Sequence, residues 1–509
     1  MKVKNYFKYI CLSFLFFSCN DDFLNVPNTG KLTDDSFWQS EEHVLEAITA
    51  TYATLQSHTG SKWTFFEELY TSMNYKGDDV DNLVAEPYGR TLANFTYTTE
   101  ASGPYNLWKT CYAGIGRANQ VMQNVAVMDE VIIDAEYKQE IIAEMKFMRA
   151  LFNFFLVTSF EDVPLVLRYE IDPDLLTPAK TPASDVWKQI EADLTEAEQY
   201  IPDAHPEKWA GRATKWTAKA YLAKAYLYQE KWAEAESKFQ DVVENGPYDL
   251  LPNYEDNFNG KGENGPETVF DIQFSGDRSN GNDERHPFSY EASSTATGGW
   301  SLFYPTAWMV EEFKNDLTDG GKYSDRVYGS IFFDDPESEM YSLGTNEMVA
   351  YSEVKEDLNH PYFFKKFVSD YDENFYSGID IPLMRFADVL LMYAEALNEN
   401  GKTTEALTQV NRVRTRSNAA ELSSMNQDEL RTQIRHHERP VELAMEMGIR
   451  WYDLYRWGRG NTATESIKTI LTNHDKPFAE NFEENKHYLY PIPLQEININ
   501  PNLEQNPNW

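Results

Sequence analysis

The amino-acid sequence predicts a mainly α-helical fold, in which helix pairs form an α-α superhelical scaffold with long irregular loop insertions and minor β structure. Three observations predict it. Apolar residues recur at a spacing of three to four over much of residues 36–250 and 381–509, which is typical of helices with one buried face. Small alanines recur in the same segments. Residues 251–380 are instead rich in glycine, asparagine, serine and aspartate, and they contain one strand-like run.

The first part of the scaffold includes a helix that is expected to be buried on every side. Residues 143–166 are apolar on nearly all faces, which predicts a central buried helix, and Pro164 is expected to end it. Residues 184–200 predict an amphipathic helix with Ser184 as its N-cap. The apolar residues that keep the helical spacing there are Val186, Ile190, Leu194 and Ala197.

Two segments have the spacing of tetratricopeptide units, in which paired helices approach closely through small alanines. One is 218–248, and the other is 385–401 followed by 404–416, where Gly401 is expected to form the turn. A repeat scaffold needs about three units, so we expect a degenerate unit at 105–160. The residues expected to meet across the two pairs are Leu222, Ala223, Tyr226, Trp232, Ala235, Phe239, Ala394, Leu397, Ala406, Val410 and Val413.

The segment between these units is expected to carry the ligand-binding surface. Thr268–Phe274 alternates apolar and polar residues, which predicts a strand, and Thr306–Phe313 predicts a short helix. Long loops inside a compact protein are usually functional. These loops also hold more aromatic rings than loop packing requires: Phe288, Tyr290, Trp300, Phe303, Tyr304, Trp308, Tyr323, Tyr328, Tyr351, Tyr362, Tyr371, Phe375 and Tyr376.

Composition excludes several classes of protein. The chain has 509 residues, 42% of them hydrophobic, so it has enough apolar material for a core and is not a disordered protein. Its 45 Lys and Arg face 82 Asp and Glu, a net charge of −37. Such acidity argues against nucleic-acid binding, which needs clustered basic residues, and against electrostatic docking to anionic lipid.

The amino terminus predicts export and lipidation. Basic residues precede the apolar run Tyr9–Phe17, which is too short to span a bilayer. Ser18 and Cys19 follow, as in a bacterial lipobox, with Cys19 as the lipidated residue; the alternative is a plain signal peptide with an incidental cysteine. We therefore expect a signal peptide at 1–18, a lipid-anchored tether at 19–35 and a single domain at 36–509, in which 251–380 is the loop-rich ligand-binding insertion.

One cysteine remains in the predicted mature chain, so no intramolecular disulfide is expected. Cys111 lies in an apolar, aromatic stretch, and we interpret it as a small buried hydrophobic residue. A catalytic thiol is the less favoured alternative, because it would need a histidine or lysine close to it in space.

Seven motifs that follow each other in order point to a family. Together they run from the signal to the last residue, and they are 21–25 (DDFLN), 116–121 (GRANQV), 143–165, 218–248, 385–401 with 411–416, 437–458 and 488–509. In this order they resemble the SusD/RagB family of Bacteroidetes outer-membrane lipoproteins. The sequence differs from the family at Glu161, where glycine is common before Asp-Val-Pro, so the local turn there is in question.

The resemblance implies a fold, a location and a role. The fold has four tetratricopeptide-like helix pairs that support an irregular binding face. The location is the cell surface at the outer membrane, with the lipid anchor as the only membrane contact. The role is the capture of oligosaccharide for a SusC-like TonB-dependent transporter barrel, without bond breaking, cofactor or nucleic acid.

Sugar rings have apolar C–H faces and a rim of hydroxyls, which suit flat aromatic rings and polar side chains respectively. Trp300 follows Gly298 and Gly299, and the resemblance implies that an aromatic residue after this turn belongs to the glycan platform. The alternative for each candidate is a structural role in its loop. The candidate glycan-contacting residues are Trp300, Tyr75, Asp78, Asp81, Tyr88, Arg90, Arg278, Phe288, Tyr290 and Tyr304.

The charged segment 437–458 is expected to be structural. Pro440 fits the first position of a helix, and four charged residues follow on one stripe, with Glu446 and Arg450 in the favourable order for an ion pair. The stripe consists of Glu442, Glu446, Arg450 and Asp453. We interpret it, together with Arg385 and Asp388, as an ion-pair network that fixes the helix in the core, in preference to the paired carboxylates of a glycosidase.

The sequence predicts no metal centre. His436 and His437 lack the spacing of a zinc-binding helix. The acidic segments Asp277–Asp283 and Asp316–Asp325 have oxygen ligands that suit Ca²⁺ but not the spacing of an EF-hand.

Three rival functions stay open at this point. The first is a peptide-binding member of the same uptake family, and the second is a lipid-anchored glycoside hydrolase. The third is a tetratricopeptide adaptor, whose groove should be polar and lined by asparagine. The sequence names no glycan, although the lack of a basic cluster favours a neutral one.

Overall fold

The structure is a computed structural model of the chain. It describes residues 37–509 apart from 57–64, 83–86, 171, 173–175, 278, 280–283, 370–371, 374–375 and 461. The long helices are α3 (Glu41–Tyr52), α7 (Ser102–Val127), α8 (Ala135–Phe160), α9 (Ala183–Tyr200), α10 (Lys215–Tyr228), α11 (Trp232–Asn245), α16 (Phe386–Glu399) and α17 (Thr403–Arg416).

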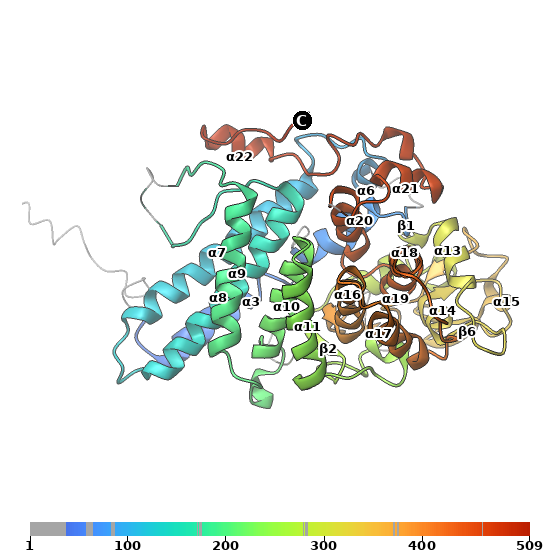
Figure 1. Cartoon of the computed structure of the whole chain (residues 1–509), viewed down its shortest axis with the longest axis horizontal. Helices are drawn as coiled ribbons and strands as arrows, with labels where there is room; N and C mark the ends of the chain where they lie inside the picture. The colour runs from blue at the N-terminus through green and yellow to red at the C-terminus, as the bar shows by residue number, and fades with distance from the viewer. Residues whose placement is uncertain are drawn as a thin grey trace, which may run out of the picture.

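These helices form one continuous superhelix. α7 packs on α8, and each helix packs on the next through α9, α10 and α11 (Figure 1). α11 then packs on α16, about 140 residues later in the sequence, and α16 packs on α17. The predicted mainly α fold is confirmed, and so are the two helix pairs and the further pair at 105–160. The insertion therefore separates α11 from α16 in the sequence, although the two helices pack against each other in the fold.

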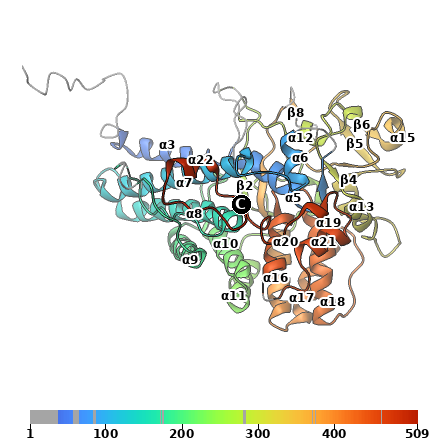
Figure 2. The ribbon, with the colours of Figure 1, turned by 90° about the horizontal axis from the view of Figure 1, so that it is seen from above.

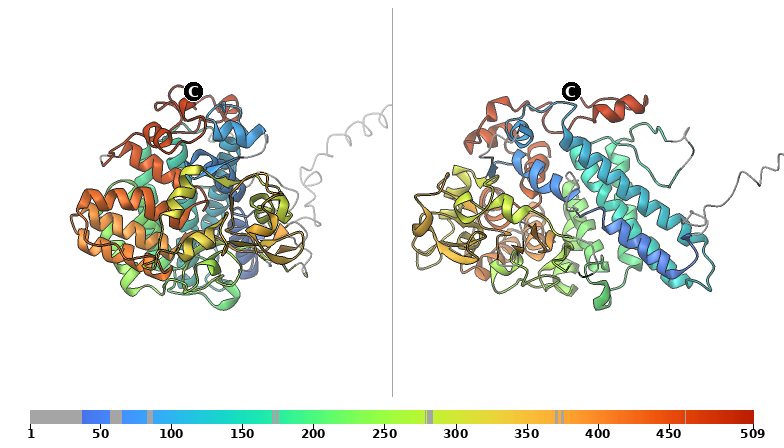
Figure 3. Two further views of the ribbon diagram at one scale, coloured as in Figure 1. Left: turned by 90° about the vertical axis from the view of Figure 1, so that its right-hand side faces the viewer. Right: turned by 180° about the vertical axis from the view of Figure 1, so that it is seen from behind.

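The insertion and the C-terminal region use shorter elements. The helices of the insertion are α12 (Phe288–Ala292), α13 (Ala307–Lys314), α14 (Asp325–Ser330) and α15 (Tyr351–Val354). Those of the C-terminal region are α18 (Gln427–Gln433), α19 (Arg439–Leu443), α20 (Ile449–Arg459), α21 (Ile467–Asn473) and α22 (Leu494–Ile499). Figures 2 and 3 show the insertion elements gathered at one end of the molecule, away from α7 and α8.

The strands are short and antiparallel, and in the described chain they form two-stranded sheets only. The pairs are β1 (Val80–Asp81) with β3 (Tyr304–Pro305), β2 (Thr268–Ile272) with β10 (Ile381–Arg385), β4 (Ile331–Phe332) with β7 (Phe363–Phe364), β5 (Glu339–Ser342) with β6 (Glu347–Ala350), and β8 (Asp372–Glu373) with β9 (Tyr376–Ser377). The β2–β10 pair joins the two ends of the insertion, because Ile272 lies opposite Ile381.

The predicted central helix is buried as expected, but it begins and ends at other residues than the sequence predicts. From Ala143 onward α8 is almost entirely buried. It ends at Phe160, before Pro164, because Glu161 turns the chain with φ of 67°. Positive φ is costly for a residue with a side chain and favours glycine. The carboxylate of Glu161 accepts a hydrogen bond from Arg459 at 3.1 Å, so this glutamate fixes a turn that lacks the common glycine.

The predicted N-cap of the next helix is wrong. α9 begins one residue before Ser184, and Pro182 occupies the cap position without a side-chain cap. The missing acceptor comes from another segment, because Asp162 Oδ1 accepts a hydrogen bond from the Ala183 N–H at 2.8 Å. A tertiary contact therefore replaces the local cap that the sequence pattern favours.

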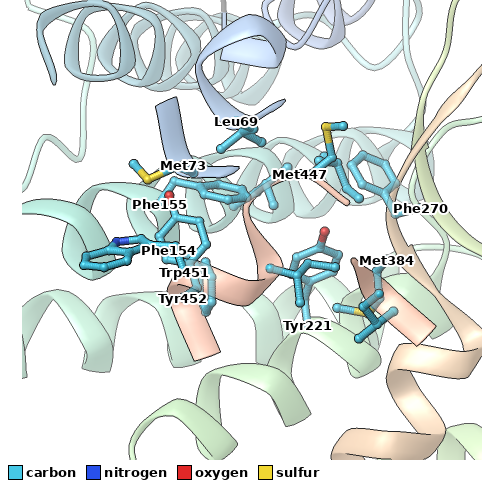
Figure 4. Packing of buried hydrophobic residues seen from close by; sticks show 14 of the residues in the cluster. Leu69, Met73, Phe154, Phe155, Tyr221, Phe270, Met384, Met447, Trp451 and Tyr452 are labelled. Atoms are coloured by element: carbon cyan, nitrogen blue, oxygen red, sulfur yellow. The ribbon is translucent and has the colours of Figure 1, made fainter. Parts of the chain in front are cut away.

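The core runs without a break from the scaffold into the insertion and the C-terminal helices. Figure 4 shows Phe155 of α8, Tyr221 of α10, Phe270 of β2 and Tyr452 of α20 in one cluster. The ring centroids of Phe155 and Tyr452 lie 5.8 Å apart, and those of Tyr221 and Phe270 lie 6.1 Å apart, which are favourable separations for aromatic pairs. Cys111 is fully buried as predicted, and burial raises the pKa of its thiol.

The charged segment at 437–458 is not one helix. α19 ends at Leu443, and α20 begins at Ile449 after a turn in which Met445, Met447 and Gly448 have positive φ. A side chain at Gly448 would meet Met73 Cβ at 2.3 Å, so the turn requires glycine.

This break separates the predicted ion pair between Glu446 and Arg450, which is therefore wrong. Glu446 instead binds Arg385 at 2.8 Å, and Arg450 binds Asp78 at 2.5 Å. The broader interpretation is confirmed, because these charges belong to a buried network. Its other pairs include Arg385 with Glu267 and Glu442, Arg326 with Asp316 and Glu438, and Asp388 with Arg439.

Candidate functional site

Trp300 is the exposed tryptophan of the described chain. Its surface is 44% exposed, whereas the other described tryptophans are half-buried or buried. A large exposed ring is unusual, because burying it would stabilise the fold. Its position after the predicted glycine turn makes it the centre of the candidate site.

The backbone around Trp300 is held rigidly while the side chain faces solvent. The Trp300 N–H donates to the Tyr290 carbonyl at 2.7 Å, and the Leu302 N–H donates to the Glu291 carbonyl at 2.8 Å. Gly298 has φ of 91°, and a side chain at Gly299 would meet the Ser293 carbonyl oxygen at 2.3 Å. Both glycines are therefore required by the turn. This arrangement fixes the backbone that carries the ring before any ligand binds, so less main-chain entropy is lost on binding.

The fold brings a second predicted locus to this turn. β1 pairs with β3, so Asp81 lies opposite Tyr304 although more than 200 residues separate them. The Tyr304 hydroxyl lies 3.4 Å from the Asn82 carbonyl oxygen. α6 (Pro87–Ala93) reaches this segment, because a side chain at Gly89 would meet Asn82 Nδ2 at 2.6 Å, and Arg90 on α6 is exposed. The face defined by Asp81, Asn82, Arg90, Trp300 and Tyr304 is called the platform below.

His360 and Asn359 lie at the platform, although the sequence does not predict them as site residues. The His360 ring lies 4.0 Å from the Tyr304 ring, centroid to centroid, and the Ser301 hydroxyl lies 3.5 Å from Asn359 Oδ1. Burial lowers the pKa of His360 and raises that of Tyr304, where Asp81 adds to the shift. Both rings are therefore neutral at neutral pH. Aromatic density in this loop was the only available signal, and it did not single out a histidine.

A buried ion pair supports the platform from below. Asp78 accepts hydrogen bonds from Arg450 Nε at 2.5 Å and Nη2 at 2.7 Å, and it also contacts His474. Although burial alone would raise the pKa of Asp78, Arg450 and His474 hold it well below its usual range. Lys476 donates to the Val80 carbonyl at 2.5 Å. These contacts fix the segment that leads into Asp81.

Several predicted site residues support the platform without being exposed on it. Asp78 and Phe288 are fully buried, and Tyr75 and Tyr290 nearly so. Tyr75 stacks on Phe303 with centroids 5.1 Å apart. In the structure these four side chains lie beneath the platform surface. Arg278, Cys19 and the side chain of Tyr88 lie outside the described residues.

The platform has the side chains that ligand binding requires. It combines a flat exposed ring, a tyrosine–histidine pair and the polar groups of Asp81, Asn82, Arg90 and Asn359. The described residues contain no group of three or more His, Cys, Asp or Glu suited to a metal. The carboxylates of segment 437–458 are bound to arginines inside the core.

Comparisons with known proteins cover most of the chain. A family model described as "SusD family" matches residues 266–509, and another described as "Starch-binding associating with outer membrane" matches residues 22–227. In the described chain, no helix is long and apolar enough to cross a membrane.

Individual relatives agree with these matches. The chain is 28% identical to SusD-like protein P25 of Formosa agariphila, across 99% of this chain and 98% of that protein. A SusD superfamily structure from Bacteroides vulgatus has a TM-score of 0.82 at 25% identity, covering 93% of this chain and 100% of the other. A laminarin-binding SusD-like protein has a TM-score of 0.74 at 23% identity, covering 92% and 100%.

Proposed function

This chain belongs to the SusD/RagB family, and from that premise we propose that it is a cell-surface lipoprotein that binds glycan. It captures oligosaccharide on the platform and delivers it to a SusC-like TonB-dependent outer-membrane transporter. It breaks no bond and needs no cofactor. A lipid on Cys19 is its only membrane anchor.

The observation that carries the proposal is the exposed ring of Trp300 on a rigid turn. The ring is 44% exposed, and its backbone is fixed by the Tyr290 carbonyl at 2.7 Å. Apolar C–H faces of a sugar can stack on such a ring, and Asp81, Asn82 and Arg90 can bond the hydroxyls around it. The platform holds one acidic and one basic side chain, so a neutral oligosaccharide suits it best.

One family model and one structural neighbour indicate which glycans to try first. One family model is described as starch-binding, and one structural neighbour as laminarin-binding. We therefore suggest maltohexaose and laminarihexaose as probes of the wild-type chain by calorimetry, with a peptide mixture as the competing class. Binding of either sugar supports the proposal. Retention of peptides and of neither sugar would favour the peptide-binding alternative.

Catalysis is tested with the same sugars. The proposal expects both probes to be recovered intact, with no new reducing ends after prolonged incubation. Release of reducing ends by the purified chain, abolished by substitution of one of its carboxylates, would instead favour the glycoside hydrolase.

Localisation has its own test. We expect the wild-type chain to fractionate with the outer membrane and to be sensitive to protease added to whole cells. Cys19→Ala should release it from the membrane fraction, because a single acylated residue is then lost. A variant that stays membrane-bound would contradict the lipid anchor.

A further inference from the structure

A second cleft lies between α3, the turn at 207–212 and β2, away from the platform. Its volume is about 820 Å³, a size typical of small-ligand sites. It shares no lining residue with the platform. Its lining residues include Leu45, Ile48, Tyr52, Ala53, Gln56, Trp209, Ala210, Arg212, Asp271, Ile272 and Gln273.

Two residues that line this cleft carry a buried polar atom without a hydrogen-bond partner in the described chain. They are Asp271 with its Oδ1 and Gln273 with its Nε2. The Tyr137 hydroxyl interacts with the Arg212 guanidinium, so among the described residues Asp271 and Gln273 provide the polar atoms of the cleft that lack a partner. Unpaired buried polar groups are rare because each costs free energy. Their concentration here indicates a site that a polar ligand completes.

The donors are held in place by other contacts. Arg212 donates through Nε to Glu144 at 2.7 Å and also through Nη2, and Glu144 accepts a hydrogen bond from Tyr52 at 2.6 Å. The side-chain oxygen of Gln273 accepts a hydrogen bond from Asn264 at 3.0 Å, so the amide nitrogen of Gln273 points away from Asn264. The pairing of Arg212 with buried Glu144 neutralises its charge. The guanidinium can therefore bond neutral oxygen atoms, such as the Tyr137 hydroxyl beside it or a hydroxyl of a ligand.

Apolar and aromatic surface completes the cleft. Leu45 and Ile272 contribute aliphatic wall. The Trp209 ring lies parallel to the Tyr137 ring, with an interplanar angle of 6°, and the Arg212 guanidinium lies 4.9 Å from its centroid. A fixed ring, aliphatic wall, two donors and one acceptor match a sugar, whose hydroxyls both donate and accept next to apolar C–H groups.

We propose that this cleft is a second binding site for a neutral oligosaccharide, separate from the platform. The inference rests on the proposed glycan-binding function and extends it to two sites on one chain. Asp271 fits this role, because burial raises its pKa to about 7. Near neutral pH its carboxyl group can therefore either donate to a hydroxyl or accept from one.

The test fills the cleft from its exposed side. Ala210 is exposed, lines the cleft and has φ of −51°, so Ala210→Trp should fold normally and occupy the site. The matched control is Ala204→Trp, an exposed alanine nearby on the same loop that does not line the cleft. Each change is made alone and with Trp300→Ala in the full chain. Maltohexaose and laminarihexaose are titrated by calorimetry, with thermal unfolding as the fold check.

For an oligosaccharide that the wild type binds, Trp300→Ala should leave a weaker residual site. Adding Ala210→Trp should reduce that residual affinity at least tenfold, and adding Ala204→Trp should leave it unchanged. Equal residual affinity in the two double variants would overturn the proposal that the cleft binds oligosaccharide. Complete loss of binding in Trp300→Ala alone would overturn it as well. In both cases the platform, and with it the proposed function, would stand.

The same experiment also shows whether the proposed function or the platform fails instead of the cleft. If the wild type binds neither sugar, the proposed function and the cleft both fail. If Trp300→Ala binds as tightly as the wild type and only Ala210→Trp abolishes binding, the cleft is supported and the platform is overturned.

Discussion

The helical scaffold and the platform of this chain are built by different means. In α10 and α11, and again in α16 and α17, the helices form because apolar residues repeat along one face, and their packing partners are next in sequence. The platform joins β1 to β3 across more than 200 residues, and it is fixed by backbone hydrogen bonds and buried ion pairs. Local periodicity therefore determines the scaffold, and long-range polar contacts determine the platform.

The largest effect should come from breaking the buried ion-pair network where the scaffold meets the insertion and the C-terminal helices. Arg385 bonds Glu267 at 2.6 Å, Glu442 at 3.0 Å and Glu446 at 2.8 Å, and all four are buried. Arg385→Ala leaves these carboxylates without that cation, and removal of one partner of a buried ion pair typically costs about 3–5 kcal/mol. Urea unfolding would measure the loss.

The control for this variant is an ion pair on the scaffold surface. Lys188 and Asp185 are exposed, and exposed pairs contribute little because water screens them. Lys188→Ala should therefore leave the urea midpoint unchanged. A similar loss in both variants would mean that burial does not distinguish the network from surface pairs.

A smaller effect should appear as a pH dependence of stability at the ends of the insertion. Burial raises the pKa of Asp380 to about 8, and Glu263 and Asp271 add to the shift. Since the unfolded carboxyl has a pKa of about 3.9, the folded chain holds the proton between these values and the unfolded chain does not. Stability should therefore fall as the pH rises from about 4 to 8, by at most about 1.4 kcal/mol per pH unit for this group.

Asp380→Asn should remove that part of the slope, because the amide does not titrate. Urea unfolding of wild type and variant at pH 5 and pH 8 measures it. An unchanged difference between the two pH values would show that Asp380 is not protonated in the fold.

The smallest effect concerns His360, the platform residue that sequence reasoning missed. Its ring packs on Tyr304, and an aromatic pair is worth about 1 kcal/mol. His360→Ala should therefore lower the free energy of unfolding by about 1 kcal/mol, and it should weaken oligosaccharide binding because the Tyr304 ring loses the neighbour that positions it. Because burial lowers the pKa of His360, wild-type affinity should be constant between pH 6.5 and 8. A strong decrease with rising pH would contradict a neutral ring.

The same contrast explains what could be predicted from the sequence. The pairs at 218–248 and 385–416 follow from alanine spacing and a glycine turn, and Trp300 follows from its place after two glycines. Ser184 was assigned as a cap because no local pattern reveals Asp162. The Glu446–Arg450 pair failed because positive φ at Met445 and Met447 breaks the helix, and such turns leave no periodic signal.

The platform was predicted only in part, for the same reason. Asp81 and Tyr304 were separate candidates, and their pairing depends on a long-range strand register. Asp78 and Phe288 were chosen by residue type, which does not distinguish an exposed aspartate or ring from a buried one. His360 lies in a loop where aromatic density was visible, but its partner Tyr304 lies 56 residues earlier in the sequence.

The central claim is that the exposed Trp300 ring, carried on a rigid turn, is responsible for glycan binding. Calorimetry of Trp300→Ala with an oligosaccharide that binds the wild type tests it most directly, with Ile499→Ala as an exposed apolar control on α22. The account predicts a loss of well over 1 kcal/mol in affinity for Trp300→Ala, no change for Ile499→Ala and unaltered thermal unfolding for both. Unchanged affinity in a folded Trp300→Ala chain would contradict it.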